Sequence, residues 1–123
     1  MDTEIALALA QLSESTDRLL VTSDALTDSQ VAGPSRLPGW TRGHVLTHLA
    51  RNADGFANLL TWARTGNETP MYPSEAARAR GIEEGAARPA AQITADLQES
   101  AAALAAAAQD LPARAWEDRK SVV

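Results

Sequence analysis

Hydrophobic residues recur at steps of three and four along most of this chain, which is the spacing of residues on one face of an α-helix. An early stripe comprises Ile5, Leu9, Leu12, Thr16 and Leu19. A later stripe, with alanines between its members, comprises Ile93, Leu97, Ser100, Leu104 and Leu111. The alternation that is typical of β-strands does not persist for more than a few residues. The pattern therefore predicts an all-α protein.

Capping and turn residues mark where the first helices should begin and end. The first helix should fade near Ala25, and Thr27 with Gln30 three residues later resembles a capping box for a short helical turn. The following stretch AGPSRLPGW contains two prolines and two glycines, which predicts a loop. Thr41 then provides a good N-cap for a second long helix.

The second half of the chain divides in the same way. The second long helix should run to about Arg64 and end in the turn of residues 65–67, where a glycine is available. After a loop with two prolines, Ser74 can cap a short helix that extends to about Glu84. Pro89 suits the first turn of a third long helix.

Three long helices and one or two short ones resemble a four-helix bundle that is missing its fourth helix. Three long helices with thin alanine faces should leave one side of the core open. No linker or internal repeat is visible, so residues 1–111 are expected to form one domain and residues 112–123 a tail.

Composition removes several classes of function. The 123 residues carry a formal net charge of −5 with no cluster of Lys or Arg, which argues against nucleic acid as a partner. No apolar run approaches the roughly 20 residues of a membrane span. Cysteine is absent, which is compatible with the cytoplasm. Any thiol chemistry would need a thiol from outside the chain.

Two histidines lie four residues apart on the second long helix. At about 100° per residue, one sector of this helix should be buried. Its members are Val45, Leu49, Ala53, Phe56 and Leu60. His48 falls at the edge of this sector with Asn52 one turn later, whereas His44 falls on the polar side, nearer solvent. A pair of histidines at this spacing supplies only two ligands and lacks the glutamate of HExxH, so periodicity selects His48 but leaves its role open.

Other residues have both a functional and a structural interpretation. Asn52 can orient His48, or can simply form a hydrogen bond at a helix interface. Met71 and Tyr72 can cover a pocket, or can pack their loop onto the bundle. Three arginines can meet a carboxylated substrate or can be ordinary exposed residues: Arg36, Arg42 and Arg51.

Three motifs resemble a known family. They are the Gly-Trp-Thr start of the second long helix (residues 39–41), the pattern H-x-x-x-H-x-x-x-N that follows it, and the string WARTGNETPMYPS (residues 62–74). Together they are similar to the N-terminal domain of the mycothiol-dependent maleylpyruvate isomerases, which belong to the DinB-like helix bundles. The resemblance extends from about Ile5 to Trp116.

The resemblance implies a metal, a thiol cofactor and a reaction. Members bind a divalent metal, usually taken to be zinc, through three ligands, of which His48 would be one. The other two are a glutamate and a histidine in an E-x-x-x-H arrangement on the last helix of the bundle. Mycothiol supplies a thiolate that adds to the double bond of maleylpyruvate; rotation and elimination then give fumarylpyruvate.

The chain departs from the family pattern at its C-terminal end. It stops at Val123 before any E-x-x-x-H, because Glu83, Glu84 and Glu99 have no histidine four residues later. One imidazole should bind zinc only weakly, so this truncated chain is expected to be inactive alone. Two alternatives stay open: a mycothiol S-transferase of the same superfamily, and a non-catalytic helical protein that self-associates through its open apolar face.

Overall fold

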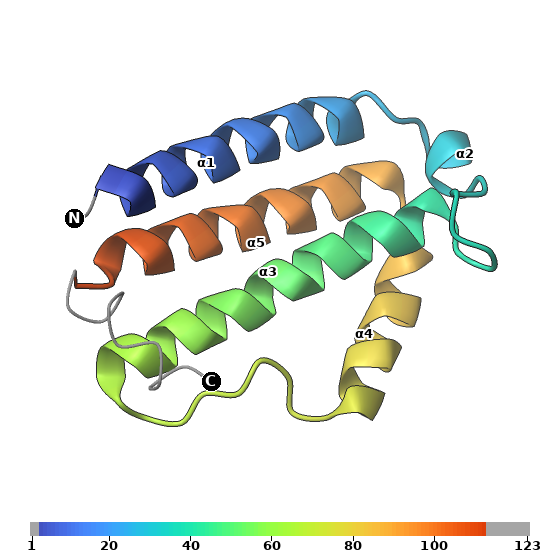
Figure 1. Ribbon diagram of the computed structural model, residues 1–123. Helices are drawn as coiled ribbons and strands as arrows, with labels where there is room; N and C mark the ends of the chain where they lie inside the picture. Colours follow the sequence, from blue (N-terminus) through green and yellow to red (C-terminus); the bar gives the residue numbers. More distant parts are fainter. Residues whose placement is uncertain (1–2, 113–123) are drawn as a thin grey trace.

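The computed structural model describes residues 3–112, which form five α-helices (Figure 1). The helices are α1 (Thr3–Asp24), α2 (Asp28–Val31), α3 (Arg42–Thr65), α4 (Glu75–Ala86) and α5 (Ala90–Asp110). No strand occurs in this part of the chain, apart from an isolated bridge between Pro34 and Thr41. The all-α prediction is thus confirmed. The proposed tail lies almost wholly outside the described residues.

The three long helices run side by side, and α5 lies between α1 and α3 (Figure 1). The short helix α4 crosses near the start of α3, and α2 contacts the starts of α3 and α5 at the same end of the molecule. Among residues 3–112 no helix is both long and apolar enough to cross a membrane.

The predicted helix ends are confirmed by their capping contacts. Thr27 and Gln30 form a reciprocal capping box at the start of α2. The Thr41 hydroxyl accepts a hydrogen bond from the backbone N–H of His44 at the start of α3. Gly66 ends α3 with φ of 75°, a left-handed conformation that favours glycine. Ser74 caps α4, which continues two residues beyond the expected end at Glu84.

The start of α5 is capped from a distance rather than locally. Pro89 stands at the N-cap position and provides no side-chain hydrogen bond. Instead Asp28, at the start of α2, accepts a hydrogen bond of 2.8 Å from the backbone N–H of Ala90. This carboxylate satisfies one of the free N–H groups of the helix and suits its positive end.

The hydrophobic core gathers around α5. Its buried cluster comprises Val31, Leu46, Ala50, Ala90, Ile93 and Leu97. The stripe predicted for α5 is confirmed at Ile93, Leu97, Ser100 and Leu111, which are buried, while Leu104 is half-buried. A buried hydrogen bond of 2.7 Å between the hydroxyls of Ser23 and Thr94 ties α1 to α5.

The buried face of α3 differs from the prediction. The residues of α3 that are buried are Gly43, Leu46, Thr47, Ala50 and Gly55. The sector predicted as core is only half-buried, and the side chain of Phe56 is 46% exposed. The reason is that α4 and α5 pack mainly against small residues of α3, so Leu49 and Phe56 are left facing a groove.

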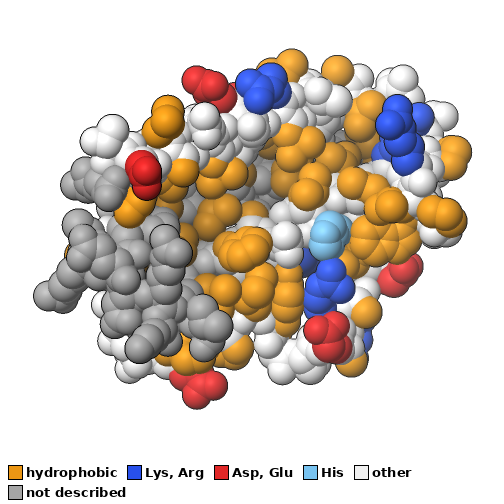
Figure 2. Space-filling view, viewed as in Figure 1, with side chains coloured by type: hydrophobic (Ala, Val, Ile, Leu, Met, Phe, Trp, Pro, Cys, Tyr) orange, Lys and Arg blue, Asp and Glu red, His pale blue; other side chains and the backbone are white. Residues whose placement is uncertain are grey.

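This groove lies between α1, α3 and α5 and has a volume of about 570 Å³. Leu9, Leu12, Thr16 and Leu19 line it from α1, Leu49, Asn52, Ala53 and Phe56 from α3, and Leu97, Ala101 and Leu104 from α5. Figure 2 shows hydrophobic side chains gathered along the hollow between α1 and α3. The open apolar side expected from the helical periodicity is therefore present.

Candidate functional site

His48 lies on α3 at the point where the loop before α3, the loop before α4 and α4 itself come together. The side chain is half-buried. Nη2 of Arg78, from α4, lies 3.2 Å from Nδ1 of His48. The Trp40 ring, just before α3, lies 5.6 Å from the imidazole at an angle of 53°. The site thus combines an imidazole, a guanidinium and an indole from three separate segments.

The surroundings of His48 favour its neutral form. Burial lowers the pKa of the imidazole below its usual 6.5, and the positive charge of Arg78 lowers it further. An arginine has only donors, so the contact with Arg78 makes Nδ1 the acceptor of the ring. At neutral pH the ring is therefore uncharged, with its proton on Nε2.

Tyr72 joins this site to the loop between α3 and α4. Its hydroxyl donates a hydrogen bond of 3.0 Å to Oδ1 of Asn52, and the guanidinium carbon of Arg78 lies 5.7 Å from the centre of its ring. Gly55 makes room for the loop, because a Cβ at this position would lie 2.8 Å from Cε of Met71 and 3.2 Å from Cζ of Tyr72. Met71 and Tyr72 therefore pack the loop onto α3, and Asn52 bonds the loop rather than His48.

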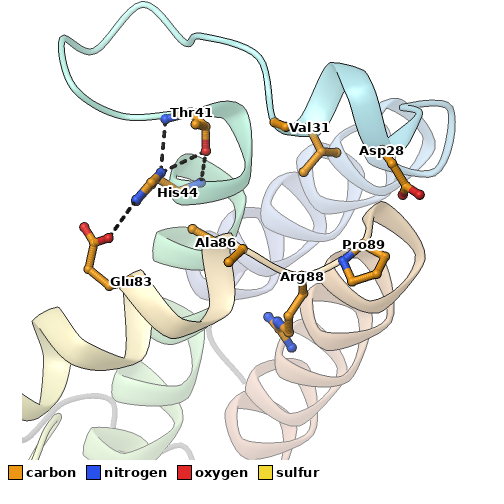
Figure 3. Close-up of a pocket in the computed structure, with 10 residues that line it drawn as sticks. Asp28, Val31, Thr41, His44, Glu83, Ala86, Arg88 and Pro89 are labelled. Carbon is orange, nitrogen blue, oxygen red and sulfur yellow. Dashed lines mark hydrogen bonds and ion pairs between the residues drawn. The ribbon is translucent and has the colours of Figure 1, made fainter.

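The prediction that His44 faces solvent is wrong. Only 15% of its side chain is exposed, because α4 covers this side of α3. Its Nδ1 accepts a hydrogen bond of 3.1 Å from the backbone N–H of Thr41, and its Nε2 lies 3.1 Å from a carboxylate oxygen of Glu83 (Figure 3). Its ring also stacks on Trp40. One ring nitrogen therefore caps the start of α3, and the other contacts α4.

Figure 3 shows His44 and Glu83 at a second cavity, of about 470 Å³, where α2, α3, α4 and the start of α5 meet. Asp28, Thr41 and Arg88 also line it. Each of these polar side chains already bonds within the fold, Asp28 to the start of α5 and Arg88 to Asp96. The cavity is thus a junction of capping and ion-pair contacts.

Of the three arginines that the sequence singled out, two have structural partners. Arg51 forms ion pairs with Asp54 on its own helix and with Asp96 on α5. Arg42 donates a hydrogen bond of 2.9 Å to the backbone oxygen of Gln30. Arg36 is exposed in the loop before α3. Arg78, which the sequence did not single out, is the arginine at His48, and only its long-range contact reveals it.

The described residues do not form a metal site by themselves. Within residues 3–112 no three histidine or acidic side chains lie close enough together to hold an ion. The hydrogen bond from Arg78 also occupies the one lone pair of the neutral His48 ring. His48 is thus at most one ligand of a larger set, and its role as a ligand stays a prediction.

Comparison with known proteins places the chain in a family. Residues 12–122 match the family model described as the mycothiol maleylpyruvate isomerase N-terminal domain. Two solved structures are similar, each with a TM-score of 0.86: the mycothiol-dependent maleylpyruvate isomerase, at 31% identity, and a variant of it with a histidine replaced by alanine, at 30%. In both, the match covers 91% of this chain and 47% of the crystallised one. No curated protein matches the sequence.

The similarity confirms the DinB-like bundle expected from the motifs, because the fold agrees over nearly the whole chain. This chain spans about half the length of the crystallised isomerase. The matched region includes both His48 and the loop that carries Tyr72. The chain therefore belongs to the family of the mycothiol maleylpyruvate isomerase N-terminal domain.

Proposed function

We propose that this chain is the N-terminal part of a metal- and mycothiol-dependent isomerase that converts maleylpyruvate to fumarylpyruvate. The observation that carries the proposal is the TM-score of 0.86 against the crystallised isomerase, at 31% identity and over 91% of this chain. The proposed reaction is thiolate addition, bond rotation and elimination. Since the match covers 47% of the isomerase, the activity is proposed for the whole protein, and this chain alone is expected to be inactive.

His48 is the residue proposed to hold the metal, which is expected to be zinc. Its half-burial and its uncharged ring support this role, because only a neutral imidazole has a lone pair for a cation. The two further ligands implied by the family resemblance do not occur in this sequence as an E-x-x-x-H. Mycothiol would supply the sulfur that a chain without cysteine lacks. The expected cytoplasmic location stays a prediction.

The groove supports a second, compatible proposal, which is self-association. Phe56 and Leu12 are each 46% exposed beside it, and most of its lining is apolar. Burial of such a surface against a second copy removes apolar area from water. Sedimentation should then show a dimer that Phe56→Ser weakens. A strict monomer at high concentration would contradict self-association and would leave the isomerase proposal intact.

The isomerase proposal can be tested with a chimera. Residues 1–112 of this chain would replace the matching half of the crystallised isomerase, and isomerisation of maleylpyruvate would be measured with mycothiol present. An active chimera is expected, because the two folds agree closely. A folded chimera that does not isomerise maleylpyruvate but catalyses the addition of mycothiol to another electrophile would instead favour the S-transferase alternative.

The proposed ligand role of His48 has a matched control in the same chimera. His48→Ala should abolish activity, whereas His44→Gln should retain most of it, because a glutamine can still bond at the start of α3. Equal activity of the His48→Ala chimera and its parent would remove His48 from the proposed site.

A further inference from the structure

The contact between Arg78 and His48 restricts what the imidazole can bind. A neutral imidazole has one nitrogen with a lone pair and one N–H group, whereas a guanidinium offers only N–H donors. With Nη2 of Arg78 at 3.2 Å, Nδ1 must be the nitrogen with the lone pair. The proton then lies on Nε2, for which residues 3–112 provide no hydrogen-bond partner.

A divalent cation needs the same lone pair. If the cation binds Nδ1, it must take the place of the guanidinium. If it binds Nε2, the proton must move to Nδ1, where it would face the N–H groups of Arg78. Positive charge on the ion and on the guanidinium adds a repulsion in either case. Coordination of a cation by His48 and the present Arg78 contact therefore exclude each other.

We propose that Arg78 competes with the metal for His48, so that its guanidinium must leave the imidazole before the imidazole can act as a ligand. The inference rests on the proposed function, in which His48 is that ligand. It makes the contact an autoinhibitory one, which lowers the metal affinity of the chain as it stands.

The surroundings of Arg78 explain why the contact is populated. Arg78 is half-buried on α4, and the Tyr72 ring lies 5.7 Å from its guanidinium carbon. A cation over an aromatic ring is held electrostatically. Tyr72 is in turn fixed to Asn52 and seated over Gly55. The loop thus holds the guanidinium beside His48.

Zinc titration of the 123-residue chain, followed through the ¹⁵N shifts of its imidazoles, tests the competition. The wild type should show His48 protonated on Nε2. Arg78→Met removes every donor at similar length and should tighten zinc binding at His48 about tenfold, the effect of losing one charge-assisted hydrogen bond. Arg78→Lys, which keeps a donor and the charge, should stay near the wild type.

Arg80→Met is the matched control, because Arg80 lies on the same helix, is exposed and makes no contact with His48. It should change zinc binding little. Equal affinity in Arg78→Met and the wild type, or a wild-type His48 protonated on Nδ1, would overturn the competition and leave the ligand role standing. If zinc shifts no His48 signal in any variant, the competition fails in this chain, and the ligand role is then decided by the His48→Ala chimera, in which the partner half supplies the remaining ligands.

Discussion

The two faces of α3 differ in how they use side-chain size. The face toward α4 and α5 is built from small residues such as Gly43 and Ala50, which are buried. A Cβ at Gly43 would lie only 2.7 Å from the backbone oxygen of Ala86, so the helices approach very closely there. The face toward the groove carries Leu49 and Phe56, which are larger yet less buried. In this helix, burial depends more on close backbone approach than on hydrophobic volume, and Leu46 is the one large apolar side chain among its buried residues.

The two histidines of α3 differ in how many of their ring nitrogens are bonded. His44 belongs to the tight side, where both of its nitrogens bond to Thr41 and Glu83. His48 does not line the groove, and Arg78 of α4 is the hydrogen-bond partner of one of its nitrogens. His44 thus uses both ring nitrogens in contacts that hold the fold together, whereas His48 uses one, in a contact with a guanidinium. Substitutions on the two faces should therefore have different effects.

The largest effect is expected at Asp96, on the tight side. Its carboxylate pairs with both Arg51 and Arg88, and Asp96→Asn would remove the counter-charge of Arg88 and leave Arg51 with only the more exposed Asp54. We expect the free energy of unfolding to fall by about 3 kcal/mol. Urea denaturation measures it. Asp54→Asn is the control, because its carboxylate is 45% exposed and should cost only about 0.5 kcal/mol. Equal losses of unfolding free energy would show that the two ion pairs of Asp96 stabilise the fold no more than the exposed ion pair of Asp54 does.

Gly43→Ala should be the next most costly change. The added methyl group would meet a backbone oxygen at 2.7 Å and Val31 at 3.1 Å, so we expect a loss of about 2 kcal/mol from overpacking. Gly81→Ala, where the nearest atom lies at 3.7 Å, should instead be neutral or stabilise by up to about 1 kcal/mol through helix propensity. Thermal unfolding of both variants and of the wild type measures these changes in stability. A stable Gly43→Ala would mean that α3 and α4 are not packed as closely as described.

On the groove face, Phe56→Gln should cost less than about 1 kcal/mol, because nearly half of the side chain is already exposed. Leu46→Ala, in the core beside it, should cost about 3 kcal/mol. Both values come from urea denaturation. If Phe56→Gln destabilised the fold as much as Leu46→Ala, the groove face would be part of the core after all.

The smallest effect concerns pH and His48. Since the pKa of His48 is lowered in the fold, the unfolded chain binds a proton first as the pH falls. The stability that the neutral ring contributes is therefore complete above pH 6.5 and is lost between 6.5 and the lower pKa of the folded state. NMR titration should place His48 below 6.5. Arg78→Met should raise this pKa only part of the way, because burial is the larger cause. A pKa at or above 6.5 would contradict the half-buried site.

Local features of the sequence were sufficient for the helix ends. Thr27 with Gln30, Thr41, Gly66 and Ser74 each act on backbone groups within four residues, so their roles follow from neighbours in the chain. The stripe of α5 was also predicted correctly, because this helix is packed on both sides and its periodic residues do face the core. The family resemblance, which rested on short contiguous motifs, was confirmed for the same reason.

Contacts between distant segments decided the features that the sequence did not predict. The capping of α5 by Asp28 joins residues that lie 62 positions apart, and the contact of His48 with Arg78 joins residues that lie 30 apart. The helical wheel could not foresee that α4 would cover His44 or that α3 would turn its small residues inward. A periodic pattern shows which residues share a face, but a neighbouring helix determines which face is buried. The sequence alone thus determined the helices, their ends and the family, while tertiary packing decided what each face of α3 does.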